Sequence, residues 1–371
     1  MIADKKGIRS QYPLLHNCTY LNTANAGAMS QATLQKGTDY LTEFAQYASQ
    51  KLPVWMAEME ETRKLFAELL NASSEEIGLT WDTSYGISWV QQMLPSDLEL
   101  VLVKHDFPSV TLPWIHHSRK IHWIDWDMKS HIDLEAIEKV LSGKPKVLVI
   151  SHVQYTNGYR IDLEAISAMC QKHGTFLIVD AIQSLGVIPI DLQKIHVDVL
   201  AASSYKWLTA GYGAGMIYVN KHSTKRLQQG ALGPGSMTDF LKDPIPAENL
   251  KNPPQSLEAG HPKPLLILMQ GQALKELKAI GWQNIYEEVK ALSTKLHTAI
   301  IGAGFTPMAP RDEKSWSGIV SFECDKSLHQ KLTDEKIITT YRPNYLRAAV
   351  HFYNEEGEIA QLKSLLNPAS T

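Results

Sequence analysis

The chain has 371 residues, of which 44% are hydrophobic and 20% charged, and its formal net charge is −3. Such a composition is typical of a globular protein with one large domain or two smaller ones. The nearly balanced charge gives no reason to expect nucleic acid or an anionic membrane as a partner.

The three cysteines, Cys18, Cys170 and Cys324, lie far apart without CxxC spacing. This pattern predicts neither a disulfide framework nor a metal site, and it favours a reducing, cytoplasmic compartment. The first residues, MIADKKGIRSQYP, lack the apolar core of a secretory signal. No apolar run approaches the roughly 20 residues that a membrane span needs.

A run of small residues, YLNTANAGAMS (20–30), follows the polar N-terminal segment. A plain turn is its simplest interpretation, although small side chains also let a backbone approach a ligand closely. From Gln31 to Ala72 the apolar residues recur at helical spacing, interrupted near Pro53, and we expect them to be structural.

The segment Ile77–Trp81 is a predicted strand, and Asp82, Thr83 and Ser84 follow it at the start of a predicted helix. These three residue types are ordinary N-caps, so capping alone explains them. A helix start after a strand is also an anion site, because its free N–H groups and the helix dipole favour negative charge.

Further strands alternate with helices along the chain. A predicted strand at Leu98–Val103 runs into Phe107 and a proline, and Ile121–Trp126 and Val147–Ile150 are two more. The last of these precedes a polar turn that contains Tyr155 and Asn157. This alternation predicts a mostly parallel sheet covered by helices on both faces.

The segment 176–219, FLIVDAIQSLGVIPIDLQKIHVDVLAASSYKWLTAGYGAGMIYV, contains the richest chemistry. Two predicted strands place Asp180 and Lys206 at their carboxyl ends, the edge at which open α/β sheets bind ligands. A lysine that is desolvated there has a lowered pKa and can form a Schiff base. The glycines of GYGAG suggest nucleotide binding, but they precede a strand, whereas a dinucleotide fingerprint follows a strand and opens a helix.

The C-terminal third begins with a stretch rich in proline and glycine (232–264), which includes LEAGHPKP. It ends with YRPNYLRAAVHFYNEEGEI, in which Arg342 and Arg347 are candidate anion ligands. A guanidinium group offers two parallel donors to a carboxylate, although surface arginines are common.

Taken in order, Asp180 with Gln183, the SSYKW lysine and RAAVHFYN resemble the class V aminotransferases. This pyridoxal-phosphate family includes cysteine desulfurases, selenocysteine lyases, kynureninase and isopenicillin N epimerase, and its corresponding C-terminal motif is RASLAFYNTEEEI. The resemblance implies the fold-type-I architecture. We expect a large α/β domain at residues 20–255, a small domain at 1–19 and 256–371, and a homodimer.

The resemblance also implies roles in binding pyridoxal phosphate. Lys206 would hold the cofactor as a Schiff base and act as the base on Cα, and Asp180 would keep the ring nitrogen protonated. Gln183 would hydrogen-bond the ring hydroxyl and Phe107, where the family often has histidine, would stack on the ring. The phosphate would contact Thr83, Ser84, Ser203, Tyr205 and, from a neighbouring subunit, His261 of LEAGHPKP.

The resemblance assigns fewer residues to the binding of the substrate. Arg347 would bind the α-carboxylate of an amino acid, with Arg342 as its companion. Asn25 would lie in a loop beside the substrate, in which Asn22 replaces a family aspartate. A family asparagine that contacts cofactor and substrate corresponds by position to Tyr155, and Asn157 is the alternative.

The reaction stays open at this stage. The interval Pro343–Leu346 lacks the cysteine that related desulfurases carry there, and Cys324 lies in a strand-like segment, so persulfide chemistry is not expected. We favour an aminotransferase-type reaction, with a β-elimination lyase or an amino-acid epimerase as alternatives. A regulator that holds the cofactor without turnover is the non-enzymatic alternative.

Overall fold

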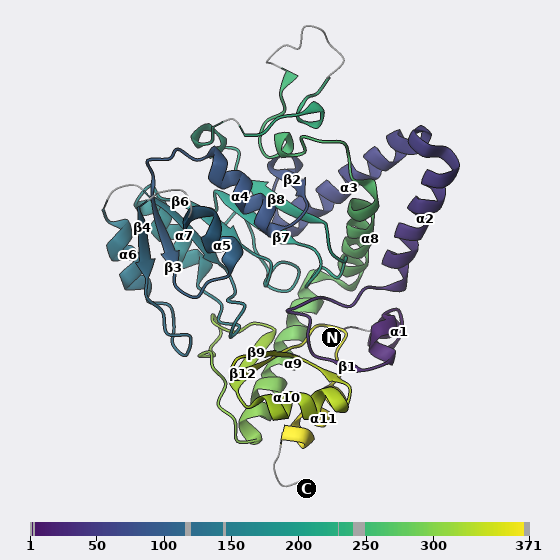
Figure 1. Cartoon of the computed structure of the whole chain (residues 1–371), viewed down its shortest axis with the longest axis vertical. Coiled ribbons are helices and arrows are strands. Elements are labelled where there is room, and N and C mark those ends of the chain that lie inside the picture. The colour runs from purple at the N-terminus through teal and green to yellow at the C-terminus, as the bar shows by residue number, and fades with distance from the viewer. Residues whose placement is uncertain are drawn as a thin grey trace.

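A seven-stranded sheet forms the centre of the larger part of the molecule (Figure 1). The computed structural model describes residue 2 and residues 4–115, 120–143, 146–228, 230–239 and 249–366, and the counts below refer to these. The strands, in their order across the sheet, are β2 (Ile77–Thr80), β8 (Gly215–Val219), β7 (Val199–Ser203), β6 (Phe176–Asp180), β5 (Lys146–Ser151), β3 (Glu99–Val103) and β4 (Ile121–Ile124).

The sheet is mostly parallel, as the sequence predicts. The five strands from β7 to β4 run in one direction, and β8 is antiparallel to both β7 and β2. In the β6–β7 register Asp180 pairs with Ala201. The carboxyl ends of β6 and β7 therefore lie at one edge, and the polar residues that follow these strands meet there.

Helices cover both faces because alternate residues of a strand point to opposite sides. On one face Leu100, Leu102 and their counterparts on the other strands pack against α4 (Thr83–Met93) and α5 (Pro108–Ile115). On the other face Val101 and Val103 belong to a larger cluster that includes α6 (Leu134–Leu141) and α7 (Leu163–Lys172).

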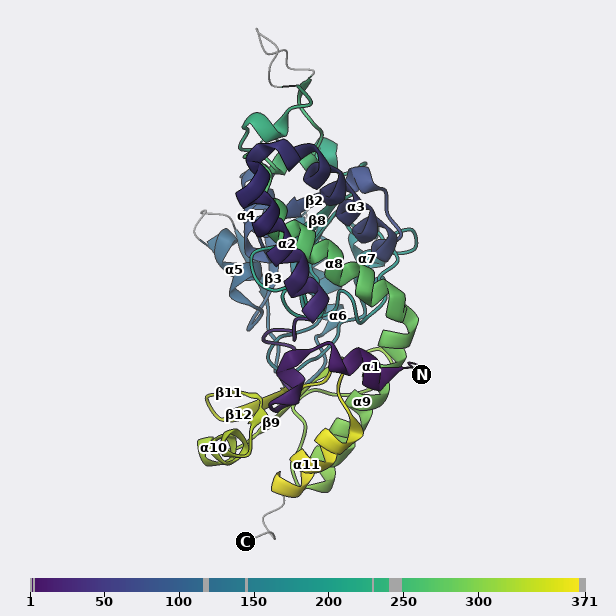
Figure 2. The ribbon, with the colours of Figure 1, turned by 90° about the vertical axis from the view of Figure 1, so that its right-hand side faces the viewer.

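Three long helices lie together at one end of the sheet (Figures 1 and 2). Helix α8 (Pro264–Ile280) packs against α2 (Gln31–Tyr47) and α3 (Leu52–Leu70). The expected break near Pro53 lies at Ala48–Lys51, and the proline occupies the first turn of α3, where the missing N–H is tolerated.

The smaller part of the molecule lies below the large sheet in Figure 1. Its antiparallel sheet has the order β11 (Thr340–Arg342), β12 (Tyr345–Ala349) and β9 (Ile319–Glu323). A two-stranded parallel pair joins β1 (Thr19–Tyr20) to β10 (Ile337–Ile338). Its helices are α9 (Trp282–Gly302), α10 (Lys326–Asp334), α11 (Glu356–Leu366) and the N-terminal α1 (Lys5–Ser10).

The N-terminal segment and the C-terminal part meet through a partly buried ion pair. Arg9 of α1 contacts Glu358 of α11 at 2.8 Å. Helix α8, however, follows the expected boundary at residue 255 and packs on α2 and α3 of the large part. This packing favours a boundary near Gly281, and the exact division into domains stays a prediction.

Candidate active site at the carboxyl edge of the sheet

Asp180 is the last residue of β6 and is only 2% exposed. Its Oδ1 accepts a hydrogen bond from the Ile182 amide at 2.9 Å, whereas its buried Oδ2 has no partner among the described residues. Burial raises the pKa of this carboxyl group, and the nearby acid Asp106 adds to the increase. Because an unsatisfied buried acceptor is costly, Oδ2 marks a place where a donor is expected to bind.

Lys206 lies in the turn that follows β7 and is 5% exposed. Burial lowers the pKa of its amine, the charges of Arg347 and Arg342 lower it further, and Asp180 opposes them. Its Nζ lies 5.8 Å from the ring centroid of Phe107 and 5.5 Å from that of Tyr205. The structure thus brings together the expected lysine, acid and stacking aromatic.

Phe107 is fixed by Asp106, an acid that the sequence analysis did not single out. The carboxylate of Asp106 accepts hydrogen bonds from the Phe107 amide (2.7 Å), the Ser151 hydroxyl (2.5 Å) and the Ser151 amide (2.9 Å). These bonds join the turns after β3 and β5. The signal in the sequence was an acid at a strand end immediately before Phe107, but Ser151 lies 45 residues away.

The predicted phosphate residues meet at the start of α4. The hydroxyls of Thr83 and Ser203 lie 3.0 Å apart and share a hydrogen bond. Each hydroxyl also accepts a hydrogen bond from the backbone amide of the other residue. The Ser84 hydroxyl lies 2.5 Å from that of Ser109. Asp82 caps the helix by accepting from the Tyr85 amide at 2.7 Å, so a negative charge stands beside the expected anion site.

Gln183 and the small-residue loop lie beside the lysine turn. The side-chain amide of Gln183 donates to the Ala24 carbonyl at 3.0 Å, and its Oε1 accepts from the Trp207 indole at 2.9 Å. The Gly27 amide donates to the Tyr205 carbonyl at 2.7 Å. A Cβ at Gly27 would lie 2.0 Å from the Lys206 carbonyl oxygen, so here a small residue permits close approach to the lysine turn.

The other loop residues are placed differently. Asn25 is exposed, and its amide donates to the Asn22 carbonyl at 2.9 Å. The Asn22 side chain accepts from the Thr340 hydroxyl at 2.6 Å, which ties this loop to β11. The loop therefore spans the two parts of the molecule, and the expected contact of Asn25 with substrate stays a prediction.

The structure places Tyr155 and Asn157 in different surroundings. The Tyr155 ring lies edge-on to Phe107 at 5.0 Å, and its carbonyl accepts from Arg347 at 2.6 Å. Asn157 instead donates to the Met128 carbonyl at 2.5 Å and accepts from the Tyr159 amide. Of the two alternatives, the structure brings Tyr155 against Phe107 and Arg347, whereas the side-chain amide of Asn157 bonds elsewhere.

Arg347 lies on β12, is 3% exposed, and forms no ion pair with any described carboxylate. Burial and the neighbouring Arg342 lower its pKa to about 10, and its Nε has no hydrogen-bond partner. In the β11–β12 register Arg347 pairs with Thr340, which makes the exposed Arg342 its diagonal neighbour on one face. A buried guanidinium without a counter-charge is suited to bind an anion.

Cys324 adjoins the hairpin that carries these arginines, because its amide donates to the Asn344 carbonyl at 3.2 Å. It follows β9 and packs with the hydrophobic core of the small part, which includes Phe322 and Leu346. Burial raises the pKa of its thiol to about 11. All three cysteines are unpaired.

Tyr205 and His261 are the remaining residues that the resemblance assigns to the phosphate. Tyr205 stacks on Tyr212 with ring centroids 4.4 Å apart. His261 is exposed and lines a cavity of about 270 Å³ together with Arg63, Glu258 and Gly213. Its loop is anchored because Glu258 accepts from both terminal nitrogens of Arg63, at 2.6 and 3.1 Å. Lys206 is not among the residues that line this cavity.

Comparison with known proteins gives the family. The family model described as "Aminotransferase class-V" matches residues 19–341. The chain belongs to this family. It is therefore a pyridoxal-phosphate-dependent enzyme, and the resemblance expected from the sequence is confirmed.

Curated members of the family carry different names. A "Probable cysteine desulfurase" from Pyrococcus abyssi (strain GE5 / Orsay) is 24% identical over 85% of this chain and 80% of its own length. An "Uncharacterized aminotransferase YcbU" from Bacillus subtilis (strain 168) is 27% identical over 95% and 94% of the two chains.

Solved structures agree on the fold. The apo cysteine desulfurase of Thermococcus onnurineus NA1 has a TM-score of 0.86 at 21% identity and covers 97% of this chain and 96% of its own. The cystine C–S lyase C-DES, in complex with cysteine persulfide, has a TM-score of 0.86 at 21% identity, covering 96% and 99% of the two chains. The fold-type-I class is thereby confirmed.

The residues of this class V enzyme fit the cofactor. The unpartnered Oδ2 of Asp180 is a buried acceptor suited to a ring N–H, and the buried Lys206 amine is suited to an aldehyde carbon. An amide nitrogen carries two hydrogens, so Gln183 retains a donor besides the one that bonds Ala24. Asp82 is the feature that fits least well, because its charge opposes a phosphate.

Proposed function

We propose that this class V enzyme attaches pyridoxal phosphate at Lys206 and removes the Cα proton of an α-amino acid, in an aminotransferase-type reaction. The proposal rests on one observation. Lys206 and Asp180 are both buried at the carboxyl ends of adjacent parallel strands, and one oxygen of Asp180 has no hydrogen-bond partner among the described residues. The bound cofactor supplies an electron sink for the electron pair left at Cα.

Lys206 acts as the base. Burial and the positive charges of Arg347 and Arg342 lower the pKa of its amine, so that a substantial neutral fraction exists near neutral pH. A neutral amine can accept the Cα proton and return it elsewhere. Asp180, as a carboxylate, accepts the ring N–H, and Phe107 provides an aromatic face for the ring.

The substrate is held by its α-carboxylate on Arg347. The buried guanidinium of Arg347 has no ion-pair partner among the described residues. The α-carboxylate of the substrate would be that partner. Arg342 is its companion, Tyr155 supports Arg347 through its carbonyl, and Asn25 belongs to the loop beside the substrate.

The phosphate binds at the start of α4, near Thr83, Ser84, Ser203 and Tyr205. His261 reaches the corresponding site of a second copy of the chain, which makes the enzyme a homodimer. The anchored loop that carries His261, exposed at its tip, supports this arrangement. The three unpaired cysteines support a reducing, cytoplasmic location. None of the described helices is both long and apolar enough to cross a bilayer.

A β-elimination lyase is the second candidate. Such a reaction needs the same lysine, acid and arginine, but no thiol from the enzyme. Cys324 has a raised pKa and packs with the core, and the hairpin between Arg342 and Arg347 contains no cysteine. One of the similar folds belongs to a protein named as a cystine C–S lyase.

The test is the visible absorption spectrum of the purified chain with pyridoxal phosphate, before and after addition of L- and D-amino acids. A band that shifts with one class of amino acid supports the proposal. Formation of pyridoxamine phosphate indicates amino-group transfer, pyruvate with a released β-group indicates the lyase, and inverted substrate indicates an epimerase. A spectrum that no amino acid changes indicates a cofactor-holding regulator.

Lys206→Ala is the companion variant. It is expected to abolish the borohydride-reducible linkage between chain and cofactor, whereas Lys194→Ala, on the exposed surface, is the control that retains it. A wild-type chain that stays colourless with added cofactor contradicts the proposal.

A further inference from the structure

The backbone carbonyl of Trp207, the residue after Lys206, accepts a hydrogen bond from a histidine of the small part. His351 lies between β12 and α11, is 0% exposed, and its Nε2 is 2.9 Å from the Trp207 carbonyl oxygen. Its Nδ1 is 2.8 Å from the Phe352 amide, which can only donate. Nδ1 therefore accepts, the ring is neutral, and the proton sits on Nε2, from which it is donated to Trp207.

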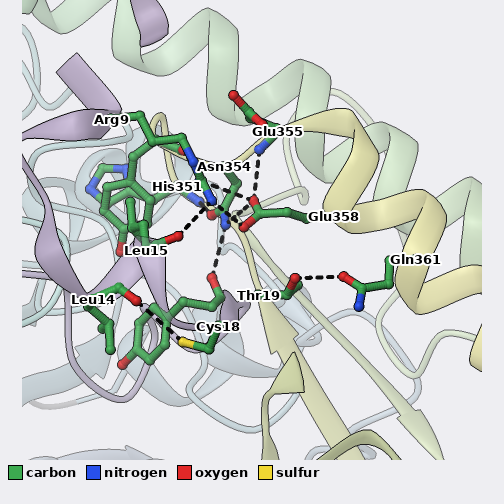
Figure 3. A network of polar contacts seen from close by, with 12 residues as sticks. Arg9, Leu14, Leu15, Cys18, Thr19, His351, Asn354, Glu355, Glu358 and Gln361 are labelled. Atoms are coloured by element: carbon green, nitrogen blue, oxygen red, sulfur yellow. Dashed lines mark hydrogen bonds and ion pairs between the residues drawn. The ribbon is translucent and has the colours of Figure 1, made fainter. Parts of the chain in front are cut away.

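A polar network holds the histidine in place (Figure 3). The His351 amide donates to Asn354 Oδ1 at 2.7 Å, and the Asn354 side chain donates to Glu358 and to the Tyr20 carbonyl, both at 2.9 Å. Glu358 in turn pairs with Arg9. The backbone of His351 is thus held by segments from both ends of the described chain.

Three successive carbonyls of the lysine turn each receive a donor from a different place. Tyr205 O accepts from the Gly27 amide at 2.7 Å, and Lys206 O accepts from the Thr209 amide at 3.1 Å. Trp207 O accepts from the imidazole of His351. The third donor is the one that a side-chain substitution can remove without changing the backbone.

His351 differs from the residue at the same place in the motif that the sequence resembles. The class V motif RASLAFYN has alanine at the position that His351 occupies in RAAVHFYN. An alanine has no group that could reach the carbonyl of Trp207.

We propose that His351 is a positioning residue for Lys206, because its Nε2–H holds the Trp207 carbonyl and thereby keeps the lysine turn closed and dry. The inference rests on the proposed function, in which Lys206 carries the cofactor. It goes beyond that function by making the small part contribute to the reactivity of the lysine.

Loss of the donor has a definite consequence. A buried carbonyl without a partner draws in water or moves, and either change weakens the desolvation that lowers the pKa of Lys206. The charged groups around the amine, Asp180, Arg347 and Arg342, are unchanged. The pKa of Lys206 is then expected to rise toward its ordinary value.

The test uses two substitutions of the same histidine. Gln in His351→Gln carries an amide N–H at a reach similar to that of Nε2, whereas the shorter side chain of His351→Asn can still accept from Phe352 but does not reach Trp207. His222→Asn, at an exposed position, is the control. The rate of attachment of pyridoxal phosphate to the apoprotein is followed by absorbance across the neutral pH range.

His351→Asn is expected to move the midpoint of the rate profile up by about one pH unit and to slow attachment at pH 7 about fivefold, since the pKa of Lys206 starts at about 7. His351→Gln and the control are expected to keep the wild-type profile. A purely structural role would lower the melting temperature and leave the midpoint in place. A wild-type midpoint in His351→Asn, or an equal displacement in His351→Gln, overturns the inference.

A second measurement needs no variant. In the full chain with ¹⁵N-labelled histidine, His351 is expected to show the neutral Nε2–H tautomer throughout the neutral range, and an Nδ1–H tautomer or ordinary titration overturns the inference. The two proposals fail differently. A wild-type chain that forms no linkage with the cofactor contradicts the proposed function and this inference with it, whereas wild-type attachment with unshifted variants contradicts this inference alone.

Discussion

Arg347 donates a hydrogen bond from Nη1 to the main-chain carbonyl of Tyr155 at 2.6 Å. The bond joins β12 of the small part to the turn after β5 of the large sheet. It orients the guanidinium without neutralising it, because a carbonyl oxygen carries no formal charge. The Nε atom is left without a partner. The arginine is therefore prepared for an anion at the junction of the two parts.

Arg347→Gln is expected to lower kcat/KM for the amino-acid substrate roughly 100-fold, which corresponds to the loss of about 2–3 kcal/mol of charge-assisted hydrogen bonding. It is also expected to raise the pKa of Lys206, because the charge of Arg347 lowers it. Steady-state kinetics with the amino acid and with the matching amine that lacks the α-carboxylate give the comparison. Equal losses for both compounds would argue against a carboxylate clamp.

Asp180→Asn keeps the size of the side chain and removes its charge. The carboxylate raises the pKa of Lys206, so its removal is expected to move the pH profile of cofactor attachment to lower pH. Exchange of the substrate Cα proton is expected to slow roughly 100-fold or more, because the ring nitrogen loses its anionic partner. Proton NMR in D₂O measures the exchange, with the exposed Asp97→Asn as control. Unchanged exchange in Asp180→Asn would refute the assignment.

Asp82→Asn is expected to tighten cofactor binding. Asn caps a helix as well as Asp does, so the acceptor for the Tyr85 amide is kept while the negative charge beside the phosphate is removed. The expected gain in affinity is about two- to fivefold, which corresponds to roughly 0.3–1 kcal/mol. Fluorescence titration of the apoprotein measures it. Asp133→Asn at the cap of α6 is the matched control, and weaker binding in Asp82→Asn would contradict a phosphate site at α4.

Cys324→Ser is expected to retain the activity toward any cysteine-type substrate within about twofold. Burial raises the pKa of the thiol to about 11, so the thiolate is scarce at neutral pH, and the side chain packs with the core of the small part. Sulfide and pyruvate release are measured together with the melting temperature. A folded variant that loses sulfur release would instead identify Cys324 as a nucleophile.

His152 gives a pH dependence of stability. It is buried, and burial lowers its pKa from 6.5 to about 3. The unfolded chain therefore binds the proton first, and the contribution to stability is complete above pH 6.5 and is lost as the pH falls toward 3. Between pH 7 and 5 the free energy of unfolding is expected to decrease by about 2 kcal/mol through this group.

The substitution His152→Gln removes this contribution. Urea unfolding at the two pH values is expected to show a smaller decrease for His152→Gln than for the wild type, whereas the exposed His222→Gln behaves like the wild type. Equal decreases in all three proteins would mean that His152 is already charged or accessible in the folded state.

Most of the candidate site residues that the sequence could predict lie at the ends of strands. Asp180, Lys206 and Phe107 each follow an apolar run, and parallel strands necessarily bring such positions to one edge. The contacts of Asp106 with Ser151 and of His351 with Trp207 could not be predicted in this way, because their partners are 45 and 144 residues apart. The choice between Tyr155 and Asn157 depended on the path of a turn, which residue types alone do not determine.

Packing between distant segments also decided the place of α8. Its sequence has an apolar helical pattern that suits either part of the molecule equally well. Only the surfaces of α2 and α3, formed by residues more than 190 positions earlier, determine where it docks.

The ion pair between Arg9 and Glu358 has a consequence for biosynthesis. Arg9 is synthesised 349 residues before its carboxylate partner. During that interval the large sheet can form on the nascent chain, while the partner of Arg9 on α11 does not yet exist. The small part, and with it the histidine that contacts the lysine turn, is completed only after α11 emerges. The enzyme is therefore expected to acquire its reactive lysine geometry as a late step of its own synthesis.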